Sequence, residues 1–146
     1  MKIYFCCAVT GGRDQTGANE KIVAHLLRRG HIVPTEHLVR SDALEPADDI
    51  DPEAVYRRDI AWIDDCDALI AEVSMPSHGV GYEIAYALGQ KKRVFCCSRR
   101  GLSLSKMITG NDSPSLVVRT YEKVDEVLEL MDMFLSELED EIKLQN

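Results

Sequence analysis

From Asp67 to Cys97 the chain reads DALIAEVSMPSHGVGYEIAYALGQKKRVFCC. The run at 67–73 predicts a buried strand, because it is short, mostly apolar and bounded by polar residues. Residues 79–90 predict a helix, and the apolar run at 93–97 predicts another strand. A strand, a helix and a second strand in this order are typical of a parallel sheet with crossover helices.

The same alternation extends to both ends of the chain. Further strands are predicted at 2–9, 31–33 and 116–118, and further helices at 16–29, 52–66 and 124–144. Gly30 suits the stop of the first helix, and Pro52 suits the first turn of the next. We therefore expect an α/β fold of the Rossmann-like or flavodoxin-like kind. It would form a single domain over residues 1–146, with a doubly wound five-stranded parallel sheet flanked by helices.

Composition narrows the classes of protein. The chain has 146 residues, of which 45% are hydrophobic, so one packed domain is expected. The formal net charge of −8 argues against a nucleic-acid polymer as partner, because such binding needs a basic surface. No apolar run approaches the roughly 20 residues that span a bilayer, and no signal peptide is recognisable after Met1. We expect a cytoplasmic protein without a membrane partner, the nucleus being the alternative in a eukaryote.

The five cysteines lie in or beside apolar runs, at positions 6, 7, 66, 96 and 97. Neighbouring residues on a strand point to opposite faces, so disulfides between adjacent cysteines are not expected. A C-x-x-C spacing typical of zinc ligands is missing, and the four histidines are scattered. The pattern indicates reduced, buried thiols and no metal site.

The segment Met75 to Glu83, MPSHGVGYE, is the strongest candidate for a ligand site. It follows the carboxyl end of a predicted strand, where parallel sheets bind ligands. Its glycines permit close backbone approach, and the helix start would direct free N–H groups at an anion. Ser77 could add a hydroxyl donor. The pattern suits a phosphate site, but it equally suits an ordinary Ser/Gly turn.

Two carboxylates could carry chemistry near this segment. Glu83 lies about one turn into the predicted helix, and Asp59 lies on the helix before it. In one pocket they could divide the work of glycoside hydrolysis, one acting on the anomeric carbon and the other carrying a proton. Each also has a simpler interpretation: Glu83 as a surface residue complementing the helix dipole, and Asp59 as the partner of a neighbouring arginine. Tyr4, in the first strand, is either a core residue or a phenol reaching the top of the sheet.

Taken in order, these motifs resemble those of the 2′-deoxynucleoside 5′-phosphate N-hydrolases, which belong to the nucleoside 2-deoxyribosyltransferase superfamily. The resemblance spans nearly the whole chain and is most specific between Pro76 and Glu83. Its motifs are Tyr4-Phe5-Cys6, Gly11-Gly12-Arg13, Thr35-Glu36-His37, Asp59, Ala71-Glu72-Val73, Pro76-Ser77, Gly79-Val80-Gly81-Tyr82-Glu83 and Leu104-Ser105-Lys106-Met107-Ile108.

The resemblance implies hydrolysis of the N-glycosidic bond of a (2′-deoxy)nucleoside 5′-monophosphate, without a metal or an organic cofactor. It implies that Glu83 is the nucleophile forming a glycosyl-enzyme ester, that Asp59 is the acid/base, and that Tyr4 lies near the sugar. The implied substrate- and phosphate-binding residues are Ser77, Gly79, Gly11, Gly12, Arg13 and His37. Ser105 is implied to reach the phosphate site of the neighbouring subunit in a homodimer.

The first loop departs from the family pattern. The family reads Cys-Gly-Ser-Ile-Arg-Gly-Gly, whereas this chain reads CCAVTGG at 6–12. Thr10 stands in place of an arginine and removes a charge-assisted phosphate donor, which Arg13 or a basic residue of the partner subunit could replace. The preferred base and the preference for a deoxy sugar therefore stay open. Two alternatives also stay open: a deoxyribosyltransferase acting on unphosphorylated nucleosides, and a non-catalytic nucleotide-binding module.

Overall fold

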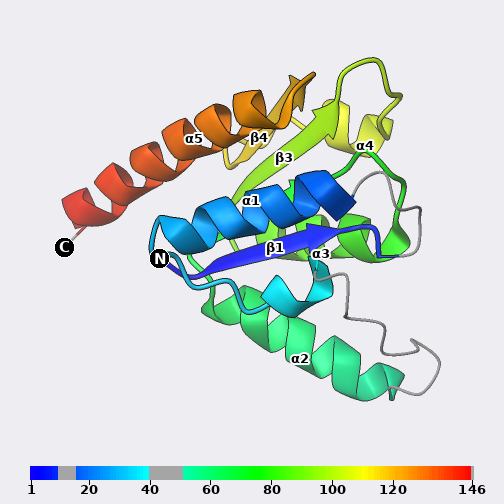
Figure 1. The fold of residues 1–146 in the computed structure, drawn as a ribbon. Helices are drawn as coiled ribbons and strands as arrows, with labels where there is room; N and C mark the ends of the chain where they lie inside the picture. Colours follow the sequence, from blue (N-terminus) through cyan, green and yellow to red (C-terminus); the bar gives the residue numbers. More distant parts are fainter. Residues whose placement is uncertain (10–15, 40–50, 146) are drawn as a thin grey trace.

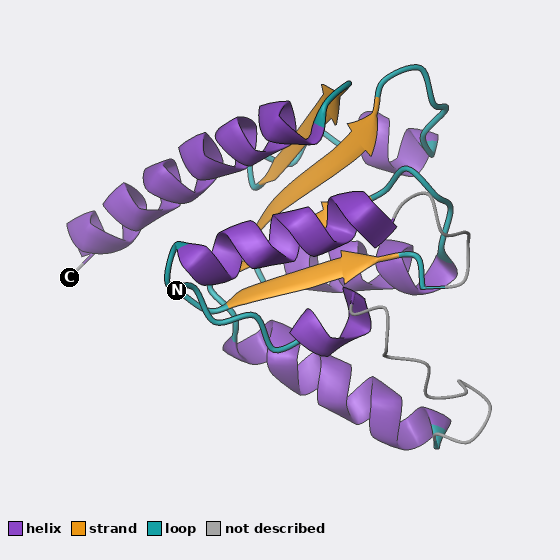
Figure 2. Cartoon of the chain, in the orientation of Figure 1, coloured by secondary structure: helices purple, strands orange, loops and turns teal. Residues whose placement is uncertain are grey.

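A computed structural model describes residues 1–9, 16–39 and 51–145 of the chain. The described part forms a parallel sheet of four strands in the order β1-β2-β3-β4, with helices on both faces (Figures 1 and 2). The strands are β1 (Ile3–Cys7), β2 (Ala68–Glu72), β3 (Arg93–Arg99) and β4 (Leu116–Tyr121). The helices are α1 (Thr16–Arg28), the 3-10 helix η1 (Glu36–Val39), α2 (Pro52–Asp65), α3 (His78–Gly89), α4 (Lys106–Thr109) and α5 (Val124–Gln145).

Alternation along the buried strands creates two cores. In β1, Ile3, Phe5 and Cys7 face the core that contains side chains of α1 and α5. Tyr4 and Cys6 face the other core, which contains side chains of α2 and α3. Because successive strand residues point to opposite faces, a strand buried on both faces is apolar throughout. The predicted α/β class with a doubly wound parallel sheet is thereby confirmed.

The prediction of five strands is not confirmed within the described ranges. Residues 31–33 lie beside β1 but form only one parallel bridge, between Ile32 and Lys2. The Ile32 amide donates to the Met1 carbonyl at 2.9 Å, and the Ile3 amide donates to the Ile32 carbonyl at 2.8 Å. The pairing ends there because Pro34 has no N–H group to donate and the chain turns towards η1.

Local sequence signals account for the start of α2 and the end of α1. Pro52 occupies the first turn of α2, where Asp51 caps the helix by accepting from the Glu53 amide at 3.3 Å. Gly30 follows α1 with a φ of 82°, a left-handed conformation that glycine adopts without steric cost. The short helix α4 was absent from the sequence prediction, because a single turn shows no helical periodicity.

All five cysteines are buried and unpaired, as their apolar setting predicts. Among the described helices, none is both long enough and apolar enough to cross a membrane.

Candidate active site

Tyr4 and Glu83 form the central contact of the candidate site. Tyr4 is fully buried in β1, and its hydroxyl donates to Glu83 Oε1 over 2.6 Å. Glu83 lies in the second turn of α3, close to its expected place about one turn into the helix. The bond joins residues 79 positions apart and fixes one carboxylate oxygen against the sheet. Glu83 is therefore a held, half-buried carboxylate, and its interpretation as a plain surface residue is wrong.

The environment of Glu83 shifts its protonation. Burial raises the pKa of the Glu83 carboxyl, and hydrogen bonds from the Tyr4 hydroxyl and the Cys6 thiol partly offset this rise. The negative charge of Asp59 raises the pKa further. Burial, with the charge of Glu83 close by, also raises the pKa of Tyr4, so the phenol stays a proton donor. Burial and a neighbouring carboxylate are two conditions that shift the pKa values of paired carboxylates in active sites.

Asp59 approaches this pair from α2. Two contacts fasten α2 to α3: the hydroxyls of Tyr56 and Tyr82 lie 3.4 Å apart, and the Tyr86 hydroxyl donates to Asp64 Oδ1 at 2.9 Å. Asp59 lies between them along the helix. Its charge raises the pKa of Glu83 and is a lesser contribution to the raised pKa of Tyr4. The two carboxylates named from the sequence are thus brought into one electrostatic neighbourhood.

Asp59 also has the arginine partner that its simpler interpretation predicts. Arg58 Nε donates to Asp59 Oδ1 at 2.9 Å. The Arg58 guanidinium carbon lies 4.7 Å from the centre of the Trp62 ring, and His37 meets that ring edge-on at 5.8 Å. His37 is therefore near the Asp59 side of the site, on η1.

Ser77 prepares the amino end of α3. It is the N-cap residue, and its Oγ accepts from the Val80 amide at 3.4 Å. The helix begins at His78, one residue before the predicted start, and Gly79 lies in its first turn. The positive end of the helix dipole and its unpaired N–H groups make this end suited to an anion.

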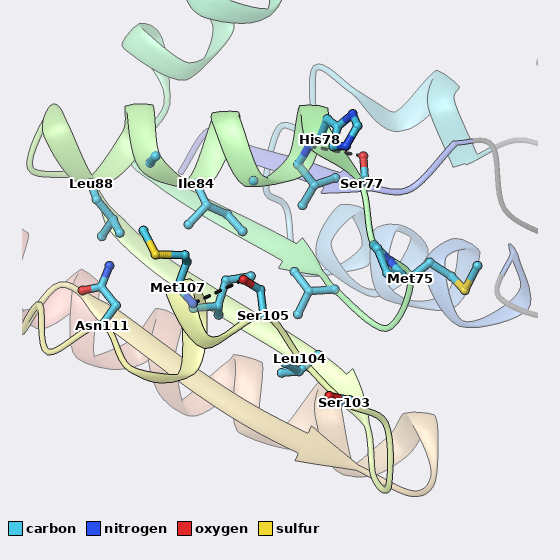
Figure 3. A pocket seen from close by; sticks show the side chains of 16 residues that line it. Met75, Ser77, His78, Ile84, Leu88, Ser103, Leu104, Ser105, Met107 and Asn111 are labelled. Atoms are coloured by element: carbon cyan, nitrogen blue, oxygen red, sulfur yellow. Dashed lines mark hydrogen bonds between the residues drawn. The ribbon is translucent and has the colours of Figure 1, made fainter.

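A cavity of about 660 Å³ opens on a different flank of α3. Ile84 and Leu88 point from α3 towards the segment that carries Ser105 and Met107 (Figure 3). Ser77 also lines it, but Glu83 does not. Because most of its lining is apolar and no carboxylate borders it, we place the candidate chemistry at Glu83 and not in this cavity.

Ser105 lies across that cavity in the same chain as Ser77. It caps α4, its Oγ accepting from the Met107 amide at 3.2 Å. The expectations for Thr10, Gly11, Gly12 and Arg13 fall outside the described residues.

Three side chains at the site, those of Cys6, Arg58 and Trp62, were not assigned a role in it from the sequence. Cys6 hydrogen-bonds Glu83. Because Cys6 comes two residues after Tyr4 on a strand, both side chains lie on the same face, and this spacing could have indicated that Cys6 is part of the site. Arg58 and Trp62 are four apart on a helix, the spacing at which side chains meet. Among the described residues, no group of three or more His, Cys, Asp or Glu side chains is arranged to hold a metal ion.

Comparisons with known proteins agree on the family. The nucleoside 2-deoxyribosyltransferase family model matches residues 3–131. A 5-hydroxymethyl-dUMP N-hydrolase of Tetraodon nigroviridis is 38% identical over 136 residues, covering 88% of this chain and 95% of the relative. The protein of that name from Danio rerio is 36% identical over 142 residues, covering 94% and 98%.

Solved structures share the fold. A CMP N-glycosidase of Clostridium botulinum superposes with a TM-score of 0.67 at 19% identity, covering 90% of this chain and 99% of that one. A 2-deoxyribosyltransferase of Bacillus psychrosaccharolyticus gives a TM-score of 0.63 at 21% identity, covering 88% and 90%. With the family model and relatives above 30% identity both spanning most of its length, the chain belongs to the nucleoside 2-deoxyribosyltransferase family.

Proposed function

We propose that this chain, acting as one domain, hydrolyses the N-glycosidic bond of (2′-deoxy)nucleoside 5′-monophosphates to a free base and a sugar phosphate. The observation that carries the proposal is the Glu83 carboxylate, held by the Tyr4 hydroxyl at 2.6 Å and within the electrostatic reach of Asp59. The names of the relatives, which are N-hydrolases of deoxynucleoside monophosphates, support the same reaction.

The first step uses Glu83 as nucleophile. Tyr4 holds Oε1, so we assign Oε2 as the oxygen that bonds to C1′ of the sugar. As that bond forms, the C1′–N bond breaks and its electron pair leaves with the base, which takes a proton from Asp59. The carboxylate stabilises the positive charge that develops on the sugar ring.

The second step releases the sugar. Water attacks C1′, the ester bond to Glu83 breaks, and Asp59 takes the proton of the water. Asp59 must therefore be protonated in the first step and ionised in the second, whereas Glu83 must begin ionised. Such a pair requires a bell-shaped pH dependence.

The phosphate is assigned to the amino end of α3. Ser77 and the first-turn backbone at Gly79 offer donors there, and the helix dipole favours an anion. Binding energy from a phosphate remote from C1′ can hold the sugar against Glu83. Gly11, Gly12, Arg13 and His37 complete the proposed binding set.

The test is a panel of deoxy- and ribonucleoside monophosphates incubated with the protein, with the free base measured by chromatography. We expect base release from at least one member and a matching amount of sugar phosphate. No base release from any member at high enzyme concentration would overturn the hydrolase proposal. Calorimetry showing binding without product would then support a non-catalytic nucleotide-binding module.

A transferase remains the competing reaction, since the same carboxylate could pass the sugar to a second base. Incubating deoxyadenosine with free cytosine distinguishes the two, because only a transferase forms deoxycytidine. We expect no exchange, since Ser77 and the α3 amino end would be left without the phosphate that they suit.

We further propose a homodimer in which Ser105 serves the neighbouring site. Ser105 is exposed, and Met107 close by has 84% of its surface exposed, so a partner subunit could cover this apolar side chain. Light scattering at micromolar concentration should give twice the chain mass. A monomer that retains full activity would overturn the shared-site arrangement.

A further inference from the structure

Arg58 is held beside the proposed reaction centre, and part of its guanidinium is unpaired among the described residues. Nε donates to Asp59 Oδ1 at 2.9 Å, and the guanidinium lies over the Trp62 ring, 4.7 Å from its centre. These two contacts fix both the position and the plane of the group. Neither Nη group of Arg58 has a hydrogen-bond partner among the described residues.

The neighbouring Arg57 shows that this arrangement is not a general property of α2. Arg57 pairs with Glu53 one turn earlier, and its side chain has 75% of its surface exposed. The Arg58 side chain has 35% exposed, so it is half-buried yet open to a ligand. The Nη donors of Arg58, which have no partner within residues 1–9, 16–39 and 51–145, therefore belong to an oriented group, unlike those of a solvated surface arginine.

The proposed reaction places the departing base next to this group. Asp59 must reach the base to give it a proton, and Arg58 is bonded to Asp59. When the C1′–N bond of a pyrimidine breaks, the electron pair enters the ring and places negative charge on the carbonyl oxygen at C2. A guanidinium hydrogen-bonded to that oxygen stabilises the charge as it develops.

We propose that Arg58 recognises a carbonyl oxygen of the base and is therefore a specificity-determining residue that favours oxo-bases over adenine. This inference rests on the proposed hydrolase function. Uracil carries carbonyl groups at C2 and C4, whereas adenine carries none. Trp62 is a positioning residue in this proposal, because its ring packs against the Arg58 guanidinium and keeps the plane of that group fixed.

The experiment measures kcat/KM for deoxyuridine monophosphate and deoxyadenosine monophosphate with the wild-type chain, Arg58→Gln and Arg57→Gln. Both variants remove one positive charge from α2, but only the first removes the oriented donor. We expect Arg58→Gln to lower kcat/KM for the uracil substrate roughly tenfold or more, as for loss of a charged hydrogen bond. The adenine substrate should change much less, and Arg57→Gln should leave both values close to wild type.

Arg58→Lys is the more discriminating variant, because it keeps the positive charge but loses the planar guanidinium. We expect it to retain the uracil preference only in part. An equal fall for both substrates would mean that Arg58 acts only through Asp59, and it would overturn base recognition. A wild-type preference for adenine would overturn it as well. If the wild-type chain releases no base at all, the hydrolase proposal itself fails, so the two failures are distinguishable.

Discussion

Each face of the sheet buries a glutamate near the carboxyl ends of the strands, and the two are held differently. Glu72, at the end of β2, is 2% exposed. It accepts from the Ser74 hydroxyl, from the Ser74 amide at 3.3 Å and from the Tyr121 hydroxyl at 3.0 Å. Glu83, on the opposite face, is half-buried and has the hydroxyl of Tyr4 and the thiol of Cys6 as donors.

The surroundings of the two carboxylates explain the difference in their proposed roles. Ser74 Oγ also accepts from the Arg99 amide at 2.8 Å, so Glu72 ties together the ends of β2, β3 and β4. Both oxygens of Glu72 are engaged, which makes it a structural anchor. Glu83 keeps one oxygen without a hydroxyl donor and has a second carboxylate nearby. A buried carboxylate is thus no sign of catalysis by itself, whereas one left partly unsatisfied beside another is.

Glu83→Gln should give the largest effect, since it removes the proposed nucleophile while keeping the shape of the side chain. We expect base release to fall by about 10⁴-fold or more. Glu72→Gln is the matched control, because it makes the same chemical change on the other face and should retain most of the activity. The measurement is kcat on the preferred nucleotide. Equal losses in the two variants would contradict the proposal that Glu83 is catalytic and Glu72 structural.

Asp59→Asn should come next in size. It removes the proton donor for the leaving base, and general acid catalysis contributes about 10²–10⁴-fold. The loss should be smaller for a substrate analogue whose leaving group needs no proton, such as a nitrophenyl glycoside of the sugar phosphate. If the analogue and the nucleotide lose activity equally, Asp59 is not the acid.

Tyr4→Phe should change the pH dependence more than the maximal rate. The Tyr4 hydrogen bond lowers the pKa of Glu83, so its removal raises that pKa further above the ordinary value of 4.5. Because the nucleophile must be ionised, the acidic limb of the kcat profile should move to higher pH. A limb left in place would show that Tyr4 does not set the charge of Glu83. Tyr121→Phe, on the opposite face, is the control.

Glu72→Gln should have the smallest effect on activity and a clear one on stability. Replacing an oxygen acceptor with an amide group leaves one of its buried donors unpaired, at about 1–3 kcal/mol of unfolding free energy. Urea unfolding should show a lower midpoint with an unchanged slope. Glu122→Gln, which loses only the exposed pair with Arg100, should cost less than about 1 kcal/mol. An unchanged urea midpoint in Glu72→Gln would contradict the proposal that Glu72 stabilises the ends of the strands.

Much of the fold could be predicted because its signals are local. The alternation of strand-like and helix-like segments predicted the α/β class, Pro52 predicted the start of α2, and Gly30 predicted the end of α1. The errors also have local causes: Pro34 limits the predicted second strand to one bridge, and the single turn of α4 is too short for a periodic pattern. The candidate site was named one residue at a time, and the sequence left open whether Asp59 and Glu83 meet.

The sequence by itself determined the order of strands and helices, since hydrophobic periodicity and capping act over a few neighbouring residues. It also supplied Tyr4, Asp59 and Glu83 as candidates. Only the tertiary structure decided that Tyr4 bonds Glu83 and that Arg58 lies between Asp59 and Trp62. Which of the two glutamates has both oxygens engaged and which keeps one without a hydroxyl donor depends on packing between segments far apart in the chain, and no local pattern encodes that packing.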